Sequence, residues 1–428
     1  MKNSEITISI FLINFIFLIP VTNAQGWRII DPGAEGCAFA YAQHPVTGVF
    51  LVSTDMAHGL LRSIDGGKTF HPASPKGHPS IFSLAPHPEI AGTWYAGMRN
   101  GYYSTGLFVT YDDGETWKKL IRNKYFGRMS NFGIVIPSQK NGEKDTLIWN
   151  LNNIVMISND GGKNFNQYNE GLTKEVPKNI TAGMTLMLYT KENEEITVYL
   201  AWGDGLFKRN LKASKWEKIP GLPYPSKPSA LAFDKNKKLI WTAFASLGIY
   251  KGSLIEKNWK LTNNKLQNVK ILRTHEKKPG TVWSYSPGPG VYKSSDEGKS
   301  WQWLTRELLC SNDYYQGNMH HGYRYSRGFS LGYFFISKAD PKTIFLDDIY
   351  ISHNGGKTWE THACKYLPQD NSWKSNGLTL LTTYEIFFDN FHPNRIFAGF
   401  SDTGLMRSEN SGESLQVISN LNHPALSS

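Results

Sequence analysis

A short motif, S/T-x-D/N-x-G-x-T/S/N-W/F/L, recurs along this chain of 428 residues. The Asp or Asn of the motif can accept hydrogen bonds from the backbone amides that follow it, and the glycine can adopt the left-handed conformation that closes a tight turn. Regular self-similarity means that one structural unit is repeated. The six copies are SIDGGKTF from Ser63, TYDDGETW from Thr110, SNDGGKNF from Ser158, SSDEGKSW from Ser294, SHNGGKTW from Ser352 and SENSGESL from Ser408.

The spacing of the motifs predicts further repeats. The first three copies start 47 and 48 residues apart, but 136 residues, close to three such periods, separate the third from the fourth. Two degenerate repeats fill this gap, VYLAWGDGLFKRNLKASKW from Val198 and LIWTAFASLGIYKGSLIEKNW from Leu239, which keep the strands but lack the Asp turn. Because propellers contain roughly 4 to 8 blades, the eight repeats predict an all-β, single β-propeller of four-stranded blades.

The strands within each repeat alternate apolar and polar residues. Because successive strands run in opposite directions, the Asp turns share one face, and the loops between second and third strands share the opposite face with the blade linkers. Two linkers are long, RELLCSNDYYQGNMHHGYRYSRG from Arg306 and HACKYLPQDNSWKSNG from His362. Insertions on one face of a repeat array usually form the binding surface, so we expect the site there.

The N-terminal segment predicts export. A Lys near the terminus, an apolar run from Ile6 to Val21 and small residues before a cleavage point are typical of a signal peptide over residues 1–24, followed by a propeller domain over residues 25–428. A membrane anchor is the alternative, but the run is short for a span of about 20 residues. We therefore expect a secreted or periplasmic monomer with no membrane insertion after cleavage.

The chain has three cysteines, an odd number that leaves at least one of them unpaired within the chain. Cys310 and Cys364 each follow the last strand of consecutive blades, whereas Cys37 lies in an apolar first strand. This placement predicts a Cys310–Cys364 disulfide and a buried Cys37, with three buried thiols as the alternative.

The net charge of +10 is spread along the chain. Proteins that bind nucleic acid concentrate Lys and Arg on one face, so the pattern disfavours such a partner. An acidic polysaccharide is compatible with the charge, and so is a basic surface without a partner. His320-His321 beside Asp313 lack a recognisable ligand spacing, so no metal and no cofactor is predicted.

Aromatic side chains on the loop face could form flat platforms for sugar rings, and half of them could instead pack the loops. The candidates are Tyr102, Tyr103, Trp202, Tyr314, Tyr315, Tyr323, Tyr325 and Trp373, with Arg324, Asn318 and Asp313 as polar partners. A polysaccharide or glycan is the partner that this surface predicts.

The turn motif resembles the Asp-box (BNR) repeat of sialidases, sortilin-type receptors and several glycoside hydrolases. Two repeats share more: TDMAHGLLRSIDGGKTF from Thr54 and SDTGLMRSENSGESL from Ser401 place an acid just before the third strand. Here the chain resembles the xyloglucanase-type endoglucanases, in which T-D-x-G-G-x-Y-R precedes the first box. The resemblance implies that Asp55 and Asp402 are the general base and general acid of an inverting hydrolysis. Asp204, Asp347 and Asp348 occupy comparable loops and are reserve candidates.

The chain also departs from that family. Ala57-His58 displace the second glycine of the motif, and the family carries two seven-bladed propellers with its acids on opposite sides of the cleft between them. Either eight blades close one ring, so that Asp55 and Asp402 face each other across the seam, or seven blades are followed by the first blade of a second propeller.

These features predict a glycoside hydrolase that acts on a plant or algal type polysaccharide of the xyloglucan or β-glucan class. The alternative is a non-catalytic propeller that binds carbohydrate or protein through the same loops, because a propeller specifies a scaffold and not a function. A sialidase is disfavoured, since the Arg-Ile-Pro of that family and its arginine triad have no counterpart here.

Overall fold

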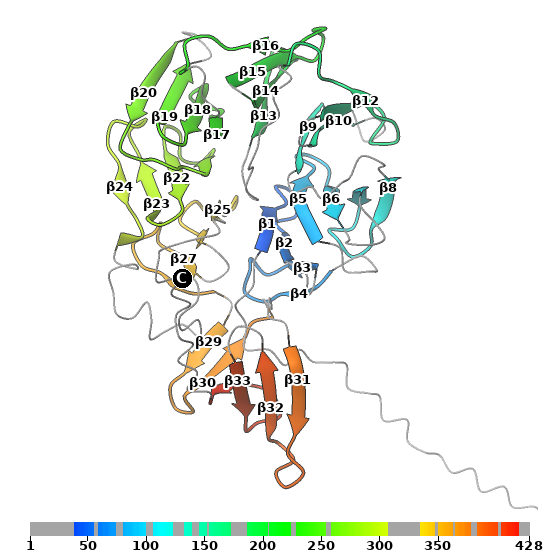
Figure 1. Ribbon diagram of the computed structural model, residues 1–428, viewed down its shortest axis with the longest axis vertical. Coiled ribbons are helices and arrows are strands. Elements are labelled where there is room, and N and C mark those ends of the chain that lie inside the picture. Colours follow the sequence, from blue (N-terminus) through cyan, green and yellow to red (C-terminus); the bar gives the residue numbers. More distant parts are fainter. Residues whose placement is uncertain are drawn as a thin grey trace, which may run out of the picture. The chain divides into compact units, whose positions relative to one another are not determined.

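The computed structural model describes most of the chain after residue 37. The described residues are 38–54, 59–73, 80–99, 106–122, 132–138, 145–151, 154–172, 186–203, 205–223, 228–253, 258–306, 334–346, 350–362, 364–377, 383–400 and 404–418. Within these ranges, the strands form eight four-stranded antiparallel sheets and one two-stranded hairpin (Figure 1). In every four-stranded sheet the strands follow one another in sequence order, which is the blade arrangement that the repeats predict.

The first four blades contain strands β1 to β16. Their bounds are β1 Ala38–Gln43, β2 Phe50–Thr54, β3 Leu60–Ser63, β4 His71–Pro72, β5 Ser80–Pro86, β6 Trp94–Arg99, β7 Gly106–Thr110, β8 Lys118–Arg122, β9 Phe132–Ser138, β10 Thr146–Leu151, β11 Ile154–Ser158, β12 Asn166–Gln167, β13 Met187–Glu192, β14 Glu195–Trp202, β15 Gly205–Asn210 and β16 Glu217–Lys218. The fourth blade is one of the two degenerate repeats, so the strand pattern survives without the Asp turn.

The remaining strands form blades five to seven, the hairpin and an eighth sheet. Their bounds are β17 Pro228–Asp234, β18 Leu239–Phe244, β19 Gly248–Ser253, β20 Trp259–Asn263, β21 Ile271–Thr274, β22 Val282–Ser286, β23 Gly290–Ser294, β24 Gln302–Trp303, β25 Phe334–Ile336, β26 Ile344–Leu346, β27 Tyr350–Ser352, β28 Glu360–Thr361, the hairpin strands β29 Cys364–Leu367 and β30 Ser372–Ser375, and the eighth sheet β31 Thr383–Phe388, β32 Ile396–Phe400, β33 Gly404–Ser408 and β34 Gln416–Val417.

The apolar core lies between blades. Each buried cluster combines strands of two consecutive blades: Leu51 and Leu60 of blade one pack with Trp94 and Phe108 of blade two, and equivalent clusters join each later pair up to blades six and seven. A single blade cannot bury both of its faces, so its stability depends on its neighbours.

Blade seven closes the ring onto blade one. The side-chain oxygen Oε1 of Gln43 accepts hydrogen bonds from the backbone N of Lys338, at 2.7 Å, and from Oγ of Ser337, at 3.3 Å. The ring of Phe50 in blade one lies 5.1 Å from that of Phe345 in blade seven. Seven blades therefore form the closed ring, and the eighth sheet stands outside it, which is the second of the two predicted arrangements.

The Asp turns have the predicted geometry. Asp65 Oδ1 accepts from the backbone N of Lys68 and Thr69 at 2.9 and 3.0 Å, and Ser63 Oγ accepts from Gly67 N at 2.9 Å. Partial burial opposes ionisation of Asp65, but the hydrogen bonds from Thr69, Ser63 and Lys68 outweigh it and lower the pKa to about 2. The charged carboxylate thus organises the turn.

A second repeated feature, which the sequence analysis missed, is a buried histidine after the first strand of a blade. In His44 and His87, Nδ1 accepts from two following backbone amides, while Nε2 reaches the next blade. For His44 and His275, Nε2 donates to the carbonyl oxygens of Thr93 and Ser337, at 3.2 and 3.1 Å. In the sequence, these histidines occur in the short patterns A-Q-H-P, A-P-H-P and R-T-H-E.

The two glycines in the Asp turn of blade seven distinguish the energetic cost of backbone strain from that of steric crowding. Both have positive φ, 79° at Gly355 and 88° at Gly356, but a Cβ added at Gly356 would lie 2.8 Å from Leu304 Cδ1, whereas nothing lies within 4 Å at Gly355. We expect Gly355→Ala to lower the free energy of unfolding by about 1 kcal/mol and Gly356→Ala by about 1–3 kcal/mol more. Denaturant unfolding measures both, and equal losses would contradict the packing of this box against the preceding blade.

The buried histidines predict a pH-dependent stability. Burial lowers the pKa of His44 and His275 below the ordinary value of 6.5, and it lowers that of His362 to about 3. Above pH 6.5 the imidazoles are neutral in both states; below it the unfolded chain binds protons that the folded protein excludes. The free energy of unfolding should fall between pH 6.5 and 5 by at most about 1.4 kcal/mol per pH unit for each histidine.

Chemical denaturation at pH 7.5, 6.5, 5.8 and 5.0 measures this slope. The window stays above the titration of the carboxylates. His71→Asn is the matched control, since His71 is exposed in β4 and its removal should leave the slope unchanged. A flat profile over this window would overturn the assignment of neutral, buried imidazoles.

Candidate functional site

The predicted acids follow equivalent strands of two different sheets. β2 ends at Thr54, directly before Asp55, and β32 ends at Phe400, shortly before Asp402. Each segment leads into a third strand through a left-handed glycine, Gly59 with φ 71° and Gly404 with φ 76°. Asp55 and Asp402 themselves lie outside the described residues. The described strands therefore establish the position of both segments in their sheets, at the end opposite the Asp turns, and not the distance between the carboxyl groups.

The seam predicted for a ring of eight blades does not form. Blade one packs against blade seven, so Asp55 belongs to the closed ring and Asp402 to the sheet outside it. The physical reason is that Ser337 and Lys338, directly after the first strand of blade seven, donate to Gln43 of blade one, which completes the ring before the eighth sheet begins. The two acids thus belong to different assemblies.

The β29–β30 hairpin links these assemblies. On one side, the backbone N of Phe70 in blade one donates to Asn376 O at 3.0 Å. On the other, Trp373 and Leu415 exchange two backbone hydrogen bonds, of 2.8 and 2.9 Å, with the eighth sheet. The hairpin lies in the second long linker, so this insertion is a structural connection as well as a candidate binding segment.

His362 lies at this junction. Its ring makes edge contacts with those of Phe70 and Phe345, at centroid distances of 5.5 and 5.0 Å. Desolvation, followed by the nearby His353, lowers the pKa of His362 to about 3, and its Nε2 has no hydrogen-bond partner among the described residues. This imidazole is therefore neutral and packs as an aromatic side chain.

Two of the predicted aromatic platforms need correction. Trp202 is 2% exposed in the cluster between blades three and four, and Trp373 is 6% exposed beside Tyr366 at a centroid distance of 4.8 Å. Both indoles face apolar neighbours, because each follows the buried face of its strand. Neither offers an open face to a sugar ring.

The remaining candidates lie outside the described residues, and their roles stay predictions. They are Tyr102, Tyr103, Tyr314, Tyr315, Tyr323, Tyr325, Arg324, Asn318 and Asp313, the reserve acids Asp204, Asp347 and Asp348, and the residues His320, His321, Cys37 and Cys310. Cys364 is buried at the start of β29, and its disulfide with Cys310 also stays a prediction.

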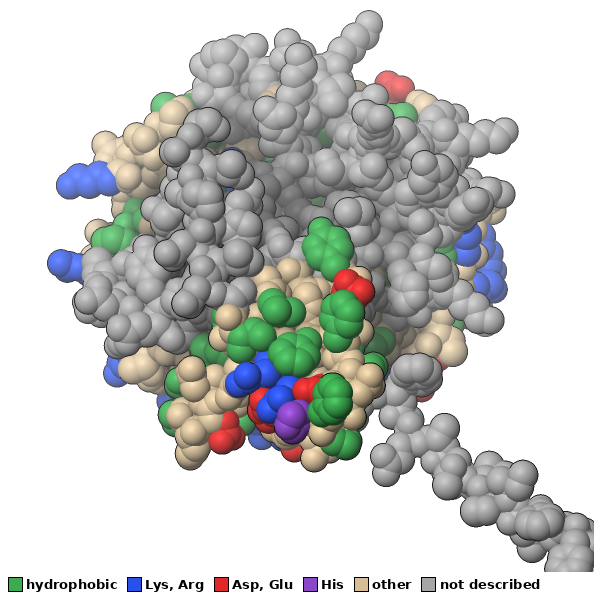
Figure 2. All heavy atoms as spheres, turned by 60° about the horizontal axis from the view of Figure 1, so that its bottom comes forward, with side chains coloured by type: hydrophobic (Ala, Val, Ile, Leu, Met, Phe, Trp, Pro, Cys, Tyr) green, Lys and Arg blue, Asp and Glu red, His purple; other side chains and the backbone are tan. Residues whose placement is uncertain are grey.

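The eighth sheet exposes an apolar strand. In β31 all six residues are exposed, among them Tyr384 at 77% and Phe388 at 68%, and Phe391 nearby reaches 90%. Figure 2, which brings the lower part of Figure 1 forward, shows hydrophobic side chains gathered here. At the position of the buried histidines, directly after the first strand, this sheet has Asp389, whose carboxylate accepts from the backbone N of Phe391 at 2.8 Å and pairs with the exposed His392 at 3.1 Å. This sheet therefore has a blade sequence without the neighbours that bury the other blades.

The described part of the chain contains neither a cluster of metal-ligating side chains nor a membrane-spanning helix. There, no three His, Cys, Asp or Glu side chains come together as metal ligands would. Within the same ranges, no helix has the length and apolar character that spanning a bilayer requires.

Comparison with known proteins identifies the class of fold. The model of the BNR/Asp-box repeat matches residues 350–361. Among solved structures, the chain is similar to an ancestral GH74 enzyme, at 17% identity and a TM-score of 0.65, with 91% of this chain and 55% of that chain covered. No curated protein sequence gives a match.

Two further structures extend the likeness. They are the GH74 enzyme of Niastella koreensis, at 14% identity and a TM-score of 0.60, and the GH74 xyloglucanase of Xanthomonas campestris, at 14% and 0.57. The alignments cover 91% of this chain and 67% and 68% of those proteins. The chain thus spans about half to two thirds of these relatives. It is an Asp-box β-propeller with the fold of the GH74 enzymes.

Trp373 supplies a test of its corrected role. We expect Trp373→Ala to lower the free energy of unfolding by about 3–5 kcal/mol, because it removes a buried indole, and Trp373→Phe to lose less. Tyr366→Ala, at a partner that is 39% exposed, is the control and should cost less than Trp373→Ala. Unchanged stability in Trp373→Ala, measured by denaturant unfolding, would contradict the structural role.

Proposed function

We propose that this protein is a glycoside hydrolase that cleaves a plant or algal type polysaccharide of the xyloglucan or β-glucan class. Asp55 and Asp402 act as the paired acid and base of an inverting mechanism. Support comes from the T-D and S-D segments before third strands and from the structural likeness to GH74 enzymes, one of them a xyloglucanase.

One observation carries the proposal. Asp55 and Asp402 each follow the second strand of a sheet, but β2 belongs to the first blade of the closed ring and β32 to the sheet outside that ring. A polysaccharide chain needs access from both sides, and two acids held by separate assemblies can flank it.

The chemistry requires unequal carboxyl groups. In an inverting hydrolysis, one carboxylic acid protonates the leaving oxygen while the other carboxylate activates water on the opposite face of the sugar, and a separation of about 6.5–9.5 Å leaves room for that water. The acid must keep its proton at the working pH, which requires a raised pKa. The aromatic residues Tyr102 and Tyr103, between β6 and β7, and Tyr314, Tyr315 and Tyr323, in the first long linker, would supply the walls that hold the glycan.

The proposed substrate fits a place of action outside the cytoplasm. Residues 1–24 have the pattern of a signal peptide, and plant and algal polysaccharides are too large to enter a cell intact. We therefore propose that the mature protein is secreted or periplasmic.

The test is release of reducing ends from xyloglucan, mixed-linkage β-glucan and laminarin. We expect Asp55→Asn and Asp402→Asn each to reduce kcat by at least about 100-fold while the affinity for the polysaccharide is retained, since each removes a proton-transfer group. Asp204→Asn and Asp348→Asn are matched controls in comparable turns and should keep activity. Substitution by Asn preserves shape, which protects the fold.

The possible results discriminate clearly. Loss of activity in both variants with normal binding and unchanged unfolding supports the proposal. Loss in Asp204→Asn or Asp348→Asn instead assigns the chemistry to a reserve acid. Tight binding to a polysaccharide or protein without turnover by the wild type would establish the non-catalytic propeller.

A further inference from the structure

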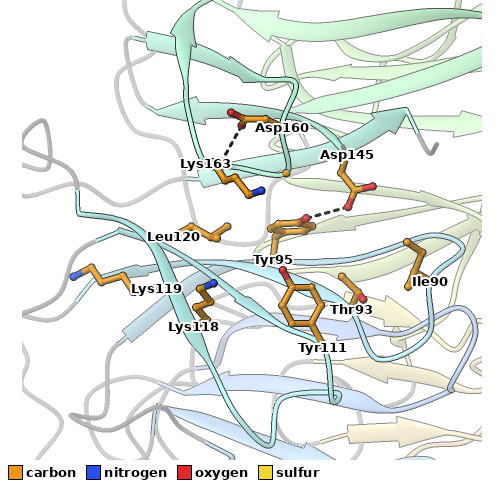
Figure 3. Close-up of a pocket in the computed structure, with 11 residues that line it drawn as sticks. Ile90, Thr93, Tyr95, Tyr111, Lys118, Lys119, Leu120, Asp145, Asp160 and Lys163 are labelled. Carbon is orange, nitrogen blue, oxygen red and sulfur yellow. Dashed lines mark hydrogen bonds between the residues drawn. The ribbon is translucent and has the colours of Figure 1, made fainter. Parts of the chain in front are cut away.

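A separate cavity of about 410 Å³ lies between blades two and three. Its lining comes from the turn between β5 and β6, the box turn and fourth strand of blade two, and the box turn of blade three (Figure 3). All of these segments lie at the end of the sheets that carries the Asp turns. The cavity is therefore distinct from the turns that hold Asp55 and Asp402, at the opposite end.

The floor of the cavity is a rigid polar network. Tyr95 donates its hydroxyl proton to Asp145 Oδ2 at 3.0 Å, and His87 Nε2 lies 3.3 Å from Asp145 Oδ1. Tyr95 and Asp145 are 2% and 4% exposed. Burial, then the charge and hydrogen bond of Asp145, raise the pKa of Tyr95, so its hydroxyl stays protonated. Both oxygens of the floor carboxylate are thus engaged by protein groups.

Lysines form the rim. Lys118 extends from β8 and Lys163 from the box turn of blade three, and Figure 3 shows both side chains directed toward the space in front of Tyr95. Neither ammonium group has an ion pair or hydrogen bond within the described part of the chain. The nearby Asp160 accepts from Ser158 Oγ at 2.7 Å and from Asn164 N and Nδ2 at 2.9 and 2.7 Å, so its oxygens are occupied.

Tyr111 supplies an aromatic wall. It belongs to the box turn of blade two and is 64% exposed, beside the buried Tyr95. An exposed aromatic face next to convergent cations is suited to a ring that has C–H groups on one side and an anionic substituent. A volume of a few hundred cubic ångströms admits one or two sugar residues and no large macromolecule.

Two other junctions of the ring lack this lysine pair, whereas Lys260 and Lys299 occupy the corresponding positions between blades five and six. At the corresponding positions between blades six and seven, Gln302 replaces Lys118 and Lys357 replaces Lys163. Between blades one and two, the positions hold His71 and Glu115. The equivalence is structural, because the box glycines Gly162 and Gly356 would each place a Cβ 2.8 Å from the fourth-strand leucine of the preceding blade.

We propose that this cavity binds an anionic sugar residue, with its carboxylate or sulfate between the ammonium groups of Lys118 and Lys163 and its ring against Tyr111. Charge-assisted hydrogen bonds to an anion are the strong ones, and both lysines are available to make them. Both oxygens of Asp145 are turned to Tyr95 and His87 in the floor, so the polar groups that remain for a ligand are the two ammonium groups. The site is independent of the hydrolase proposal, because it needs neither Asp55 nor Asp402.

Isothermal titration with trigalacturonate, a sulfated galactose oligosaccharide and neutral cellotriose tests the site. We expect binding of one or both acidic oligosaccharides and none of cellotriose. The double variant Lys118→Gln/Lys163→Gln should weaken binding at least tenfold, whereas Lys299→Gln/Lys357→Gln, which removes the same charge from two other box turns, should not. Tyr111→Ala should weaken binding and Tyr111→Phe should retain it.

Each result decides the proposal. The two acidic ligands distinguish a carboxylate from a sulfate as the preferred group. Equal weakening by both lysine pairs would show non-specific attraction to a basic surface and overturn the site, as would equal binding of cellotriose or no binding of either acidic ligand. All five substituted residues have exposed side chains, so unfolding curves should match that of the wild type.

Discussion

The packing of each blade against the next is the interaction on which the rest of the structure depends. Each four-stranded sheet has apolar residues on its strands and cannot bury them alone, so the core consists of clusters shared by neighbouring blades. The last of these clusters joins Phe50 to Phe345 and closes seven blades into a ring. A propeller without this contact would leave two sheet faces in water.

Polar side chains fix the geometry that apolar packing leaves free. The box carboxylates organise turns within a blade, since their hydrogen bonds run to amides only three or four residues away. The buried histidines act between blades, because Nδ1 is held by the local backbone while Nε2 reaches the next sheet. Together they set the turn conformation and the spacing of neighbouring blades.

The eighth sheet shows what happens when that spacing partner is missing. It keeps the box turn, with Ser408 Oγ accepting from Gly412 N at 2.8 Å, yet its first strand is exposed and Asp389 stands where blades one, two and six have a buried histidine. The hairpin that carries Trp373 holds it beside the ring. The proposed catalytic pair therefore depends on a connection outside the repeat, whereas the proposed anion site depends only on two adjacent blades.

The sequence by itself determined the local units: the box turns, the four strands of each repeat, including the two degenerate ones, and the second and third strands on either side of Asp55 and Asp402. These follow from hydrogen bonds and apolar alternation over a few residues, which a sequence displays directly. Only the tertiary structure decided that seven blades close into a ring, through the hydrogen bond between Gln43 and Lys338, nearly 300 residues apart, and the contact between Phe50 and Phe345. It also decided that Trp202 and Trp373 are buried. Ring closure and burial depend on which distant surfaces meet, and no local pattern encodes that choice.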